Sequence, residues 1–227
     1  MMRLLVLLFG LCSFLMACGD SPGGRGSRIL AIGDSMMAWN GLVGQSIPDV
    51  VAETLAEPVV DRAVSGARMI YRLPVTGAAG LSIPKQYRGG SWDWVIVNGG
   101  GNDLWLGCGC DSCDAKLDRM ISADGAAGEI AELVQRIRRN GARVIYIGYL
   151  RVPGRSSPIS GCRDEGDILD ARLAAMAAAD AGVTFLPFAD LVPDGDLSFH
   201  ALDRVHPSPK ASRLIGQRIA ATIEAAR

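Results

Sequence analysis

The sequence predicts an α/β fold in which a five-stranded parallel sheet is covered by helices on both faces. Short apolar runs alternate with longer helix-like patterns, the runs are almost wholly apolar, and the 227-residue chain is 49% hydrophobic. Strands that alternate with helices build parallel sheets, and burial on both faces makes such strands apolar throughout. A chain of this length can bury one full core, so we expect a single domain over residues 28–227.

The five predicted strands are short, and each is followed by turn or loop residues. Gly33 ends the first strand, because glycine tolerates the turn that follows. In chain order the strands are Arg28–Ile32, Pro58–Asp61, Trp92–Val97, Arg143–Gly148 and Val183–Pro187.

Helical patterns fill most of the intervals between these strands. Apolar residues recur at helical spacing in Leu42–Glu57, where Pro48 begins or breaks the helix, and in Ala126–Arg139. An alanine-rich helix is expected over Ile168–Ala181. In a last helix Ser208 is expected to be the cap, with proline in the first turn.

The stretch 67–90 is irregular in sequence. It is rich in glycine and proline, and we expect a long connection with a short helix near residues 82–87. Connections of this length inside compact domains are often functional.

Charge is nearly balanced along the chain, with a formal net charge of −1. No basic run stands out in the sequence, so nucleic acid is not expected as a partner. The sequence leaves the oligomeric state open.

The N-terminus has the composition of a targeting segment. Leu4–Met16 is an apolar run of 13 residues behind Arg3, shorter than the roughly 20 residues that span a bilayer. Leu15-Met16-Ala17-Cys18 resembles a bacterial lipoprotein signal, which implies cleavage before Cys18 and a diacylglyceryl group on its sulfur. We therefore expect a signal peptide over residues 1–17 and a lipidated, flexible tether over 18–27. The alternative is an ordinary secretory signal.

Either leader directs the protein to the bacterial cell envelope. We expect a lipoprotein that is anchored in a membrane and faces the periplasm, or an exported protein. The lipid anchor would then make the membrane a partner.

A serine at the end of the first strand is the first candidate for catalysis. In Gly33-Asp34-Ser35 the serine follows a strand and precedes a segment that can become helical, so its N–H can stabilise negative charge on a substrate oxygen. A serine hydroxyl needs a base at neutral pH. His206 is the expected base, because Asp203 precedes it by three residues. Taken alone, Gly-Asp-Ser favours a simple capped turn over a catalytic serine.

The other polar candidates also follow predicted strands. Ser35 follows the first strand, Gly66 the second and Asn102 the third, while Asp203 and His206 follow the fifth. Ligands of doubly wound sheets bind beyond the carboxyl ends of the strands. The sequence therefore predicts that these residues meet at one edge of the sheet.

Taken in order, these blocks resemble the SGNH hydrolases, the GDSL-type esterases and lipases. Met36 departs from that family pattern, which usually has leucine there. The matching blocks are Gly33-Asp34-Ser35, Gly66, Gly100-Gly101-Asn102-Asp103 and Asp203-Arg204-Val205-His206. The resemblance implies a flavodoxin-like, three-layer sandwich with strand order 2-1-3-4-5. It also implies a serine nucleophile that hydrolyses ester or thioester bonds.

The resemblance and the chemistry assign a role to each block. Ser35 would attack the acyl carbon, His206 would take and return the proton, and Asp203 would orient the imidazole. Glycine at 66 would let the backbone approach the substrate closely. The oxyanion would be held by the N–H groups of Ser35 and Gly66 and by the Asn102 amide, with Asp34 and Asp103 supporting the loops. No metal and no cofactor is required.

Four cysteines besides Cys18 remain after removal of the leader. Export makes disulfides the default, and a zinc site is the alternative. In the implied strand order the two cysteine-containing loops share one edge. We therefore expect Cys162 to pair with one of Cys108, Cys110 and Cys113, and the remaining two to pair locally, with a 108–110 bond least favoured.

Several functions remain open at this level. The leading hypothesis is an exported serine esterase that acts on small acyl esters or lysophospholipids. Alternatives are an O-acetyl esterase of polysaccharides or cell wall, and a catalytically silent binding lipoprotein of the same fold. A mononucleotide binder is disfavoured, because Gly-Asp-Ser is no phosphate-cradling loop. Trp105 is either a wall of the acyl pocket or a plain packing residue, and His200 is expected at the surface.

Overall fold

The computed structural model describes residues 26–152, 154 and 157–227. The predicted signal peptide 1–17, Cys18 and most of the tether lie outside these ranges. Within them, no helix is both long enough and apolar enough to cross a membrane.

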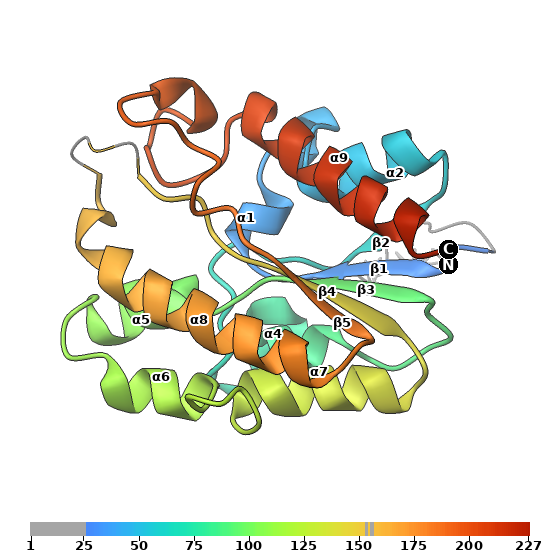
Figure 1. The fold of residues 1–227 in the computed structure, drawn as a ribbon, viewed down its shortest axis with the longest axis horizontal. Coiled ribbons are helices and arrows are strands. Elements are labelled where there is room, and N and C mark those ends of the chain that lie inside the picture. Colours follow the sequence, from blue (N-terminus) through green and yellow to red (C-terminus); the bar gives the residue numbers. More distant parts are fainter. Residues whose placement is uncertain (1–25, 153, 155–156) are drawn as a thin grey trace, which may run out of the picture.

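A five-stranded parallel sheet forms the centre of the molecule (Figure 1). Its strand order is β2-β1-β3-β4-β5, which confirms the order 2-1-3-4-5. In register, Ile29 of β1 lies opposite Val59 of β2 and Trp94 of β3. The strands are β1 (Ile29–Ile32), β2 (Val59–Asp61), β3 (Trp94–Val97), β4 (Arg143–Ile147) and β5 (Val183–Leu186).

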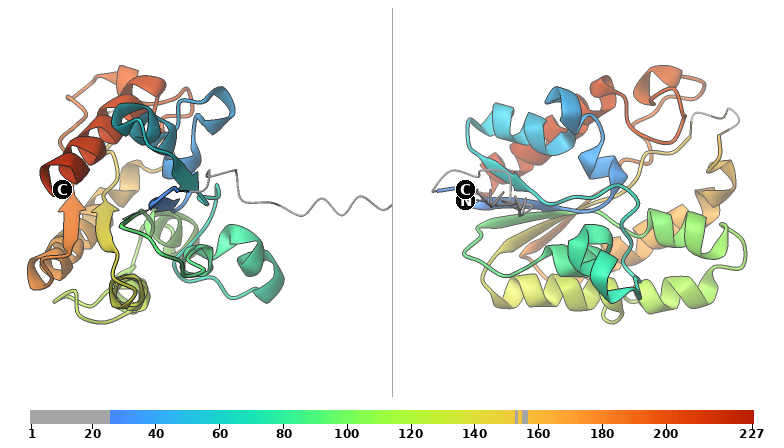
Figure 2. Two further views of the ribbon diagram at one scale, coloured as in Figure 1. Left: turned by 90° about the vertical axis from the view of Figure 1, so that its right-hand side faces the viewer. Right: turned by 180° about the vertical axis from the view of Figure 1, so that it is seen from behind.

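Helices cover both faces of the sheet, which makes a three-layer sandwich (Figures 1 and 2). One face packs against α1 (Ser35–Ala38), α2 (Ile47–Leu55) and α9 (Pro209–Ala225). The other face packs against α4 (Ile83–Gln86), α5 (Gly101–Cys108), α6 (Asp114–Met120), α7 (Glu129–Arg139) and α8 (Arg163–Ala179).

Alternate residues of each strand supply the two cores. In β1, Ile29 and Ala31 face α2 and α9, while Leu30 and Ile32 face the opposite helices, and all four are fully buried. Side chains of a strand point alternately to opposite faces, so a strand buried on both sides must be apolar at every position. This explains the continuous apolar runs in the sequence.

Helix ends agree well with the sequence where capping residues mark them. Ser46 caps α2 in a capping box with Asp49, and Ser208 caps α9 by accepting from the Ala211 N–H. The short helix expected near residues 82–87 is α4. Short helical turns complete the chain: η1 (Gly41–Val43), α3 (Pro74–Thr76), η2 (Gly77–Leu81), η3 (Ser160–Cys162) and η4 (Leu197–Phe199).

Three helical regions differ from the sequence prediction. Helix α8 begins at Arg163, five residues before the predicted start, because Asp164 and Glu165 are well placed in a first helical turn. Helices α5 and α6 were not predicted. Glycines and cysteines interrupt the apolar pattern there, and few residues of either helix are buried.

A glycine in α9 permits the close packing of α9 on α2. An added Cβ at Gly216 would lie 2.6 Å from the Val50 Cβ. Alanine normally stabilises a helix interior relative to glycine, but here the added methyl group has no room. We expect Gly216→Ala to lower the free energy of unfolding by about 1–3 kcal/mol, measured by urea denaturation.

The matched control is Gly107→Ala in α5. There the added Cβ would meet only the flexible end of Lys116, at 3.3 Å from Cε. This variant should be neutral or more stable by up to about 1 kcal/mol. Equal effects of the two substitutions would contradict the packing argument.

Candidate active site

The serine turn lies where β1 ends and α1 begins. Asp34 is the N-cap of α1, and its Oδ1 accepts a hydrogen bond of 3.0 Å from the Met36 N–H. Ser35 is the first residue of the helix, where N–H groups have no intrahelical acceptor. The turn therefore presents the Ser35 hydroxyl and N–H together at the carboxyl edge of the sheet.

The buried carboxylate of Asp34 joins this turn to two other strand ends. Its Oδ1 accepts from Asn98 Nδ2 at 2.9 Å, and its Oδ2 accepts from the Tyr149 hydroxyl at 2.6 Å. That hydroxyl in turn accepts from the Gly101 N–H at 3.0 Å. Burial raises the pKa of Asp34, and the hydrogen bonds from Tyr149, Asn98 and Met36 oppose this rise.

The connection between β2 and β3 is tied to the same turn. Gln86 accepts from the Gly33 N–H at 2.7 Å and donates to the Gly33 carbonyl at 2.9 Å. A Cβ at Gly33 would collide with the Asn98 side chain, so only glycine fits at this position. The long connection thus has a structural role at the serine turn.

The His206 side chain is held by its neighbours. Asp203 Oδ2 lies 2.6 Å from His206 Nδ1, and Asp203 Oδ1 accepts from the N–H groups of Val205 and His206. Trp39 stacks on the imidazole with 3.8 Å between ring centroids and 6° between planes. Burial alone would raise the pKa of Asp203, but the His206 side-chain bond and the two backbone bonds outweigh it and lower that pKa.

Asn102 and Asp103 fix the segment that follows β2. Asn102 Nδ2 donates to the Ala67 carbonyl at 3.0 Å and still has a second hydrogen, since a carboxamide has two donors. Asp103 accepts from the N–H groups of Met69 and Ile70 at 2.8 and 2.9 Å. Burial raises the pKa of Asp103 to about 6 despite these bonds.

Gly66 precedes this fixed segment and is exposed. Its φ is +81°, which favours glycine, whereas an added Cβ would meet no other protein atom within 4 Å. Without a bound substrate, the backbone conformation and not a lack of space therefore explains why glycine occupies position 66.

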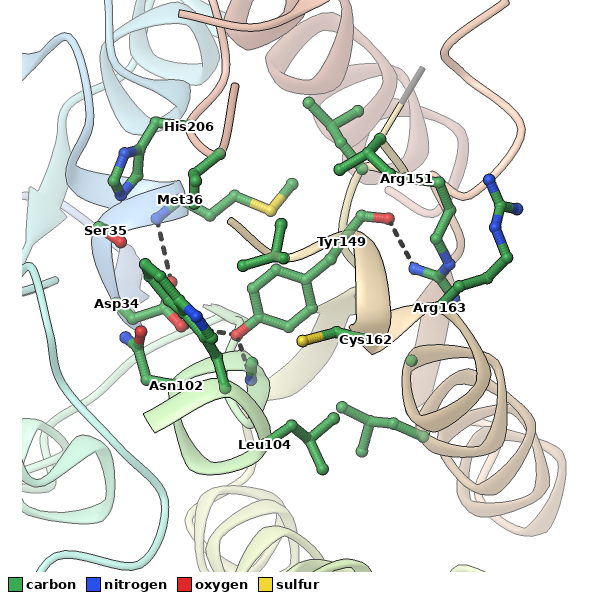
Figure 3. Close-up of a pocket in the computed structure, with 18 of the residues that line it drawn as sticks. Asp34, Ser35, Met36, Asn102, Leu104, Tyr149, Arg151, Cys162, Arg163 and His206 are labelled. Carbon is green, nitrogen blue, oxygen red and sulfur yellow. Dashed lines mark hydrogen bonds between the residues drawn. The ribbon is translucent and has the colours of Figure 1, made fainter. Parts of the chain in front are cut away.

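Ser35, Asn102 and His206 line one cavity of about 100 Å³ (Figure 3). Figure 3 shows the imidazole pointing toward Ser35, although no hydrogen bond joins these two described side chains. Catalytic hydrogen bonds are often long before a substrate binds. Asp203 and Gly66 do not line the cavity. Asp203 is instead hydrogen-bonded to His206, which does line the cavity.

The remainder of this cavity is mainly apolar. Its walls come from helices α5 and α8 and from the end of β4, and they include Leu104, Trp105, Tyr149, Ile159 and Leu169. Trp105 thus lies in the wall, as one of its two interpretations predicted. Arg151, with ion pairs to Asp167 and Asp170, lies at the far end.

Two disulfides flank the cavity. Cys110 pairs with Cys162, and Cys108 pairs with Cys113, which confirms the expected pattern of one long-range and one local bond. Cys162 also lines the cavity. Among the described residues, no group of three or more histidine, cysteine or acidic side chains is placed to hold a metal.

Sequence reasoning missed three residues of the site, and it also placed His200, which does not line the cavity, wrongly. Asn98 and Tyr149 directly follow strands, so the rule about carboxyl ends could have identified them. The Trp39 stacking partner had no sequence signal. His200 is only 6% exposed, so the expected surface position is wrong; Pro207 pairs with it in an isolated bridge.

A known family accounts for most of the chain. Residues 31–214 match the GDSL-like lipase/acylhydrolase family. The chain belongs to this family. Membership makes it a hydrolase of the GDSL/SGNH esterase type, and the parallel sheet of order 2-1-3-4-5 is the SGNH hydrolase fold. No curated protein sequence matches it.

Solved structures of several esterases have the same fold. A carbohydrate acetylesterase family member from Sinorhizobium meliloti is 14% identical, with a TM-score of 0.64 over 88% of this chain and 98% of that one. The inhibitor-bound aryl esterase of M. smegmatis is 17% identical, with a TM-score of 0.62 over 88% and 99%. A family two carbohydrate esterase from Clostridium thermocellum, in complex with cellohexaose, is 21% identical, with a TM-score of 0.58 over 88% and 64%.

The Tyr149 hydroxyl is expected to matter for both stability and activity. Tyr149→Phe removes a hydrogen bond to a buried carboxylate, and such bonds contribute about 1.5–3 kcal/mol. We expect that loss in urea denaturation, together with lower kcat, because the serine turn and α5 are no longer joined. In the control Tyr146→Phe, the lost bond is to the neutral Gly99 carbonyl, and the stability loss should be smaller. A smaller loss for Tyr149→Phe than for the control would contradict this interpretation.

The raised pKa of Asp103 predicts how stability depends on pH. Between pH 4 and 6 the folded protein keeps a proton that the unfolded chain has released, so the Asp103 contribution to stability falls as pH rises. Asp103→Asn should therefore make the slope of unfolding free energy against pH more positive, by at most about 1.4 kcal/mol per pH unit. Urea denaturation at pH 4.5, 5.5 and 6.5 measures it.

Asp124→Asn is the control for this measurement. The hydrogen bond from the Ser122 hydroxyl lowers the pKa of the exposed Asp124, so its proton is already released across the range. Its slope should equal that of the wild type. An unchanged slope in Asp103→Asn would show that the carboxyl titrates normally.

Proposed function

We propose that this GDSL-family protein is an exported serine esterase with Ser35 as nucleophile, His206 as base and Asp203 as the group that orients it. The observation that carries this proposal is the meeting of three distant segments around one cavity. Ser35, Asn102 and His206 line it, and the Nδ1 atom of His206 lies 2.6 Å from Asp203 Oδ2. A hydroxyl, an imidazole–carboxylate pair and amide donors together are the requirements for acyl transfer.

The proposed reaction has two stages. His206 Nε2 removes the proton from Ser35 Oγ as the oxygen attacks the acyl carbon, and the protonated imidazole then gives that proton to the departing alcohol. Water repeats the sequence on the acyl-enzyme, which releases the acid and restores the serine. The lowered pKa of Asp203 keeps this carboxylate charged, and its charge stabilises the imidazolium.

Amide donors would stabilise the tetrahedral oxyanion. The N–H groups of Ser35 and Gly66 and the second Asn102 hydrogen are the proposed donors. Loss of one such donor typically costs about 2.7–4 kcal/mol of the activation barrier. The bond from Asn102 to Ala67 fixes the amide in advance, so no reorganisation is needed during the reaction.

The size and lining of the cavity favour a short acyl group. Its volume of about 100 Å³ is below the roughly 300–1,000 Å³ typical of drug-sized ligand sites, and its walls are mainly apolar. We therefore place small acyl esters ahead of lysophospholipids as substrates. An O-acetylated carbohydrate is the second candidate, because an acetyl group would fit the same small cavity while the sugar stays outside.

We also propose that the protein is held in the bacterial envelope by a lipid on Cys18. The support is the sequence pattern alone, since these residues lie outside the described ranges. The two disulfides agree with an oxidising compartment such as the periplasm.

Hydrolysis of p-nitrophenyl esters of increasing chain length tests the proposed reaction. We expect the acetyl and butyryl esters to be cleaved faster than long-chain esters, and a fluorophosphonate to label the protein. Ser35→Ala should lower kcat by about 10³-fold or more and abolish labelling. Ser112→Ala, which changes an exposed serine outside the cavity, should do neither.

Other outcomes would redirect or end the proposal. Labelling and turnover that survive Ser35→Ala would exclude Ser35 as nucleophile. Ester binding without turnover would favour the silent lipoprotein. Release of acetate from an acetylated glycan, with weak activity on p-nitrophenyl acetate, would favour the carbohydrate substrate.

A further inference from the structure

A second cavity, of about 310 Å³, lies among α4, α6, α7 and the segment Met69–Arg72. Figure 2 shows α4 close to α7 on the face of the sheet opposite α2 and α9. The cavity shares none of its described lining residues with the cavity around Ser35. It is thus separate from the proposed esterase site.

The lining of this second cavity is strongly cationic. Arg72, Lys85, Arg119 and Arg136 line it against a single carboxylate, Glu129. Within the described ranges, no ion pair involves any of these four cations. We call these five residues and the space between them the cationic cavity.

The walls of the cationic cavity are fixed by contacts of their own. Arg136 donates to the Pro84 carbonyl, and its guanidinium lies 5.6 Å from the centroid of the Tyr87 ring. Asp103 holds the N–H groups of Met69 and Ile70 on the other side. Arg136 and the backbone that leads to Arg72 are therefore fixed before a ligand binds, which lowers the entropic cost of binding. The side chains of Arg72, Lys85 and Arg119 are exposed to an incoming ligand.

This concentration of positive charge is unusual for the chain as a whole. The protein has 24 acidic residues and a net charge of −1, so acidic side chains are available to neutralise basic ones. Like charges that face one cavity repel each other and destabilise the fold. A ligand with several negative charges would relieve this repulsion.

We propose that the cationic cavity binds a phosphate-bearing ligand. Arginine forms paired hydrogen bonds with phosphate oxygens, and three arginines and a lysine suit a multiply charged group better than one carboxylate. The volume lies within the range of small-molecule sites. The ligand is either a soluble phosphate compound or the headgroup of an anionic lipid. This site goes beyond the proposed esterase function and does not depend on it.

Calorimetric titration with inorganic pyrophosphate tests the site. We expect saturable one-to-one binding that weakens as salt is added. Arg119→Gln should weaken it about tenfold, because a charge-assisted contact is lost. The matched control is Arg139→Gln on α7, which removes an exposed charge that does not line the cavity. The urea midpoint and the circular dichroism spectrum of both variants should equal those of the wild type, which shows that they are folded.

A vesicle experiment distinguishes the two sources of phosphate. Wild type and Arg119→Gln are sedimented with phosphatidylglycerol vesicles and with phosphatidylcholine vesicles. If the ligand is a lipid headgroup, more wild type than Arg119→Gln should sediment with phosphatidylglycerol vesicles, and the two should sediment equally with phosphatidylcholine vesicles. If the ligand is a soluble phosphate compound, pyrophosphate should bind, and the two proteins should sediment equally with both kinds of vesicle. The proposal is overturned if neither probe binds saturably, or if Arg119→Gln and Arg139→Gln weaken binding equally.

Discussion

The buried carboxylate of Asp34 is the interaction on which the site depends. It caps α1, accepts from Asn98 at the end of β3, and accepts from Tyr149 at the end of β4. Three neighbouring strand ends are thereby joined through one buried carboxyl group. A buried polar group is tolerated only when its hydrogen bonds are satisfied, so each of these partners is needed for the others to stay in place. The position of Ser35 is therefore fixed jointly by the ends of β1, β3 and β4.

Much of this arrangement could be predicted from sequence, because it follows from periodicity and from the rule about carboxyl ends. Local patterns predict the strands, α7, the cap at Ser208 and the edge that carries Ser35 and His206. Contacts between distant side chains do not. Nothing in the sequence around Trp39 indicates that its ring stacks on His206, since that contact depends on how two loops meet. Helices α5 and α6 were not predicted because glycines and cysteines interrupt their apolar pattern and few of their residues are buried.

The distribution of charge is another feature that local sequence patterns do not predict. Arg72, Lys85, Arg119 and Arg136 are spread over 65 positions, so no window of sequence is basic. The fold brings them together because α4, α6 and α7 pack on one face of the sheet. The cysteines behave similarly: the Cys110–Cys162 bond spans 52 residues and joins the end of α5 to the start of α8. The long-range disulfide could be expected, because the strand order implied by the resemblance brings the two cysteine-containing loops to one edge. No such rule indicated the cationic cavity.

The described chain begins and ends at one edge of the sheet. Arg28 precedes β1 there, and the Ala226 carbonyl after α9 accepts from Arg143 at the start of β4 (Figure 1). Ser35 and His206 lie at the opposite edge. Attachment through either terminus, to a bilayer, a solid support or a fused protein, would therefore leave the mouth of the ester cavity turned outward. A molecule held in this way would meet substrates arriving from the surrounding medium before those embedded in the surface that carries it.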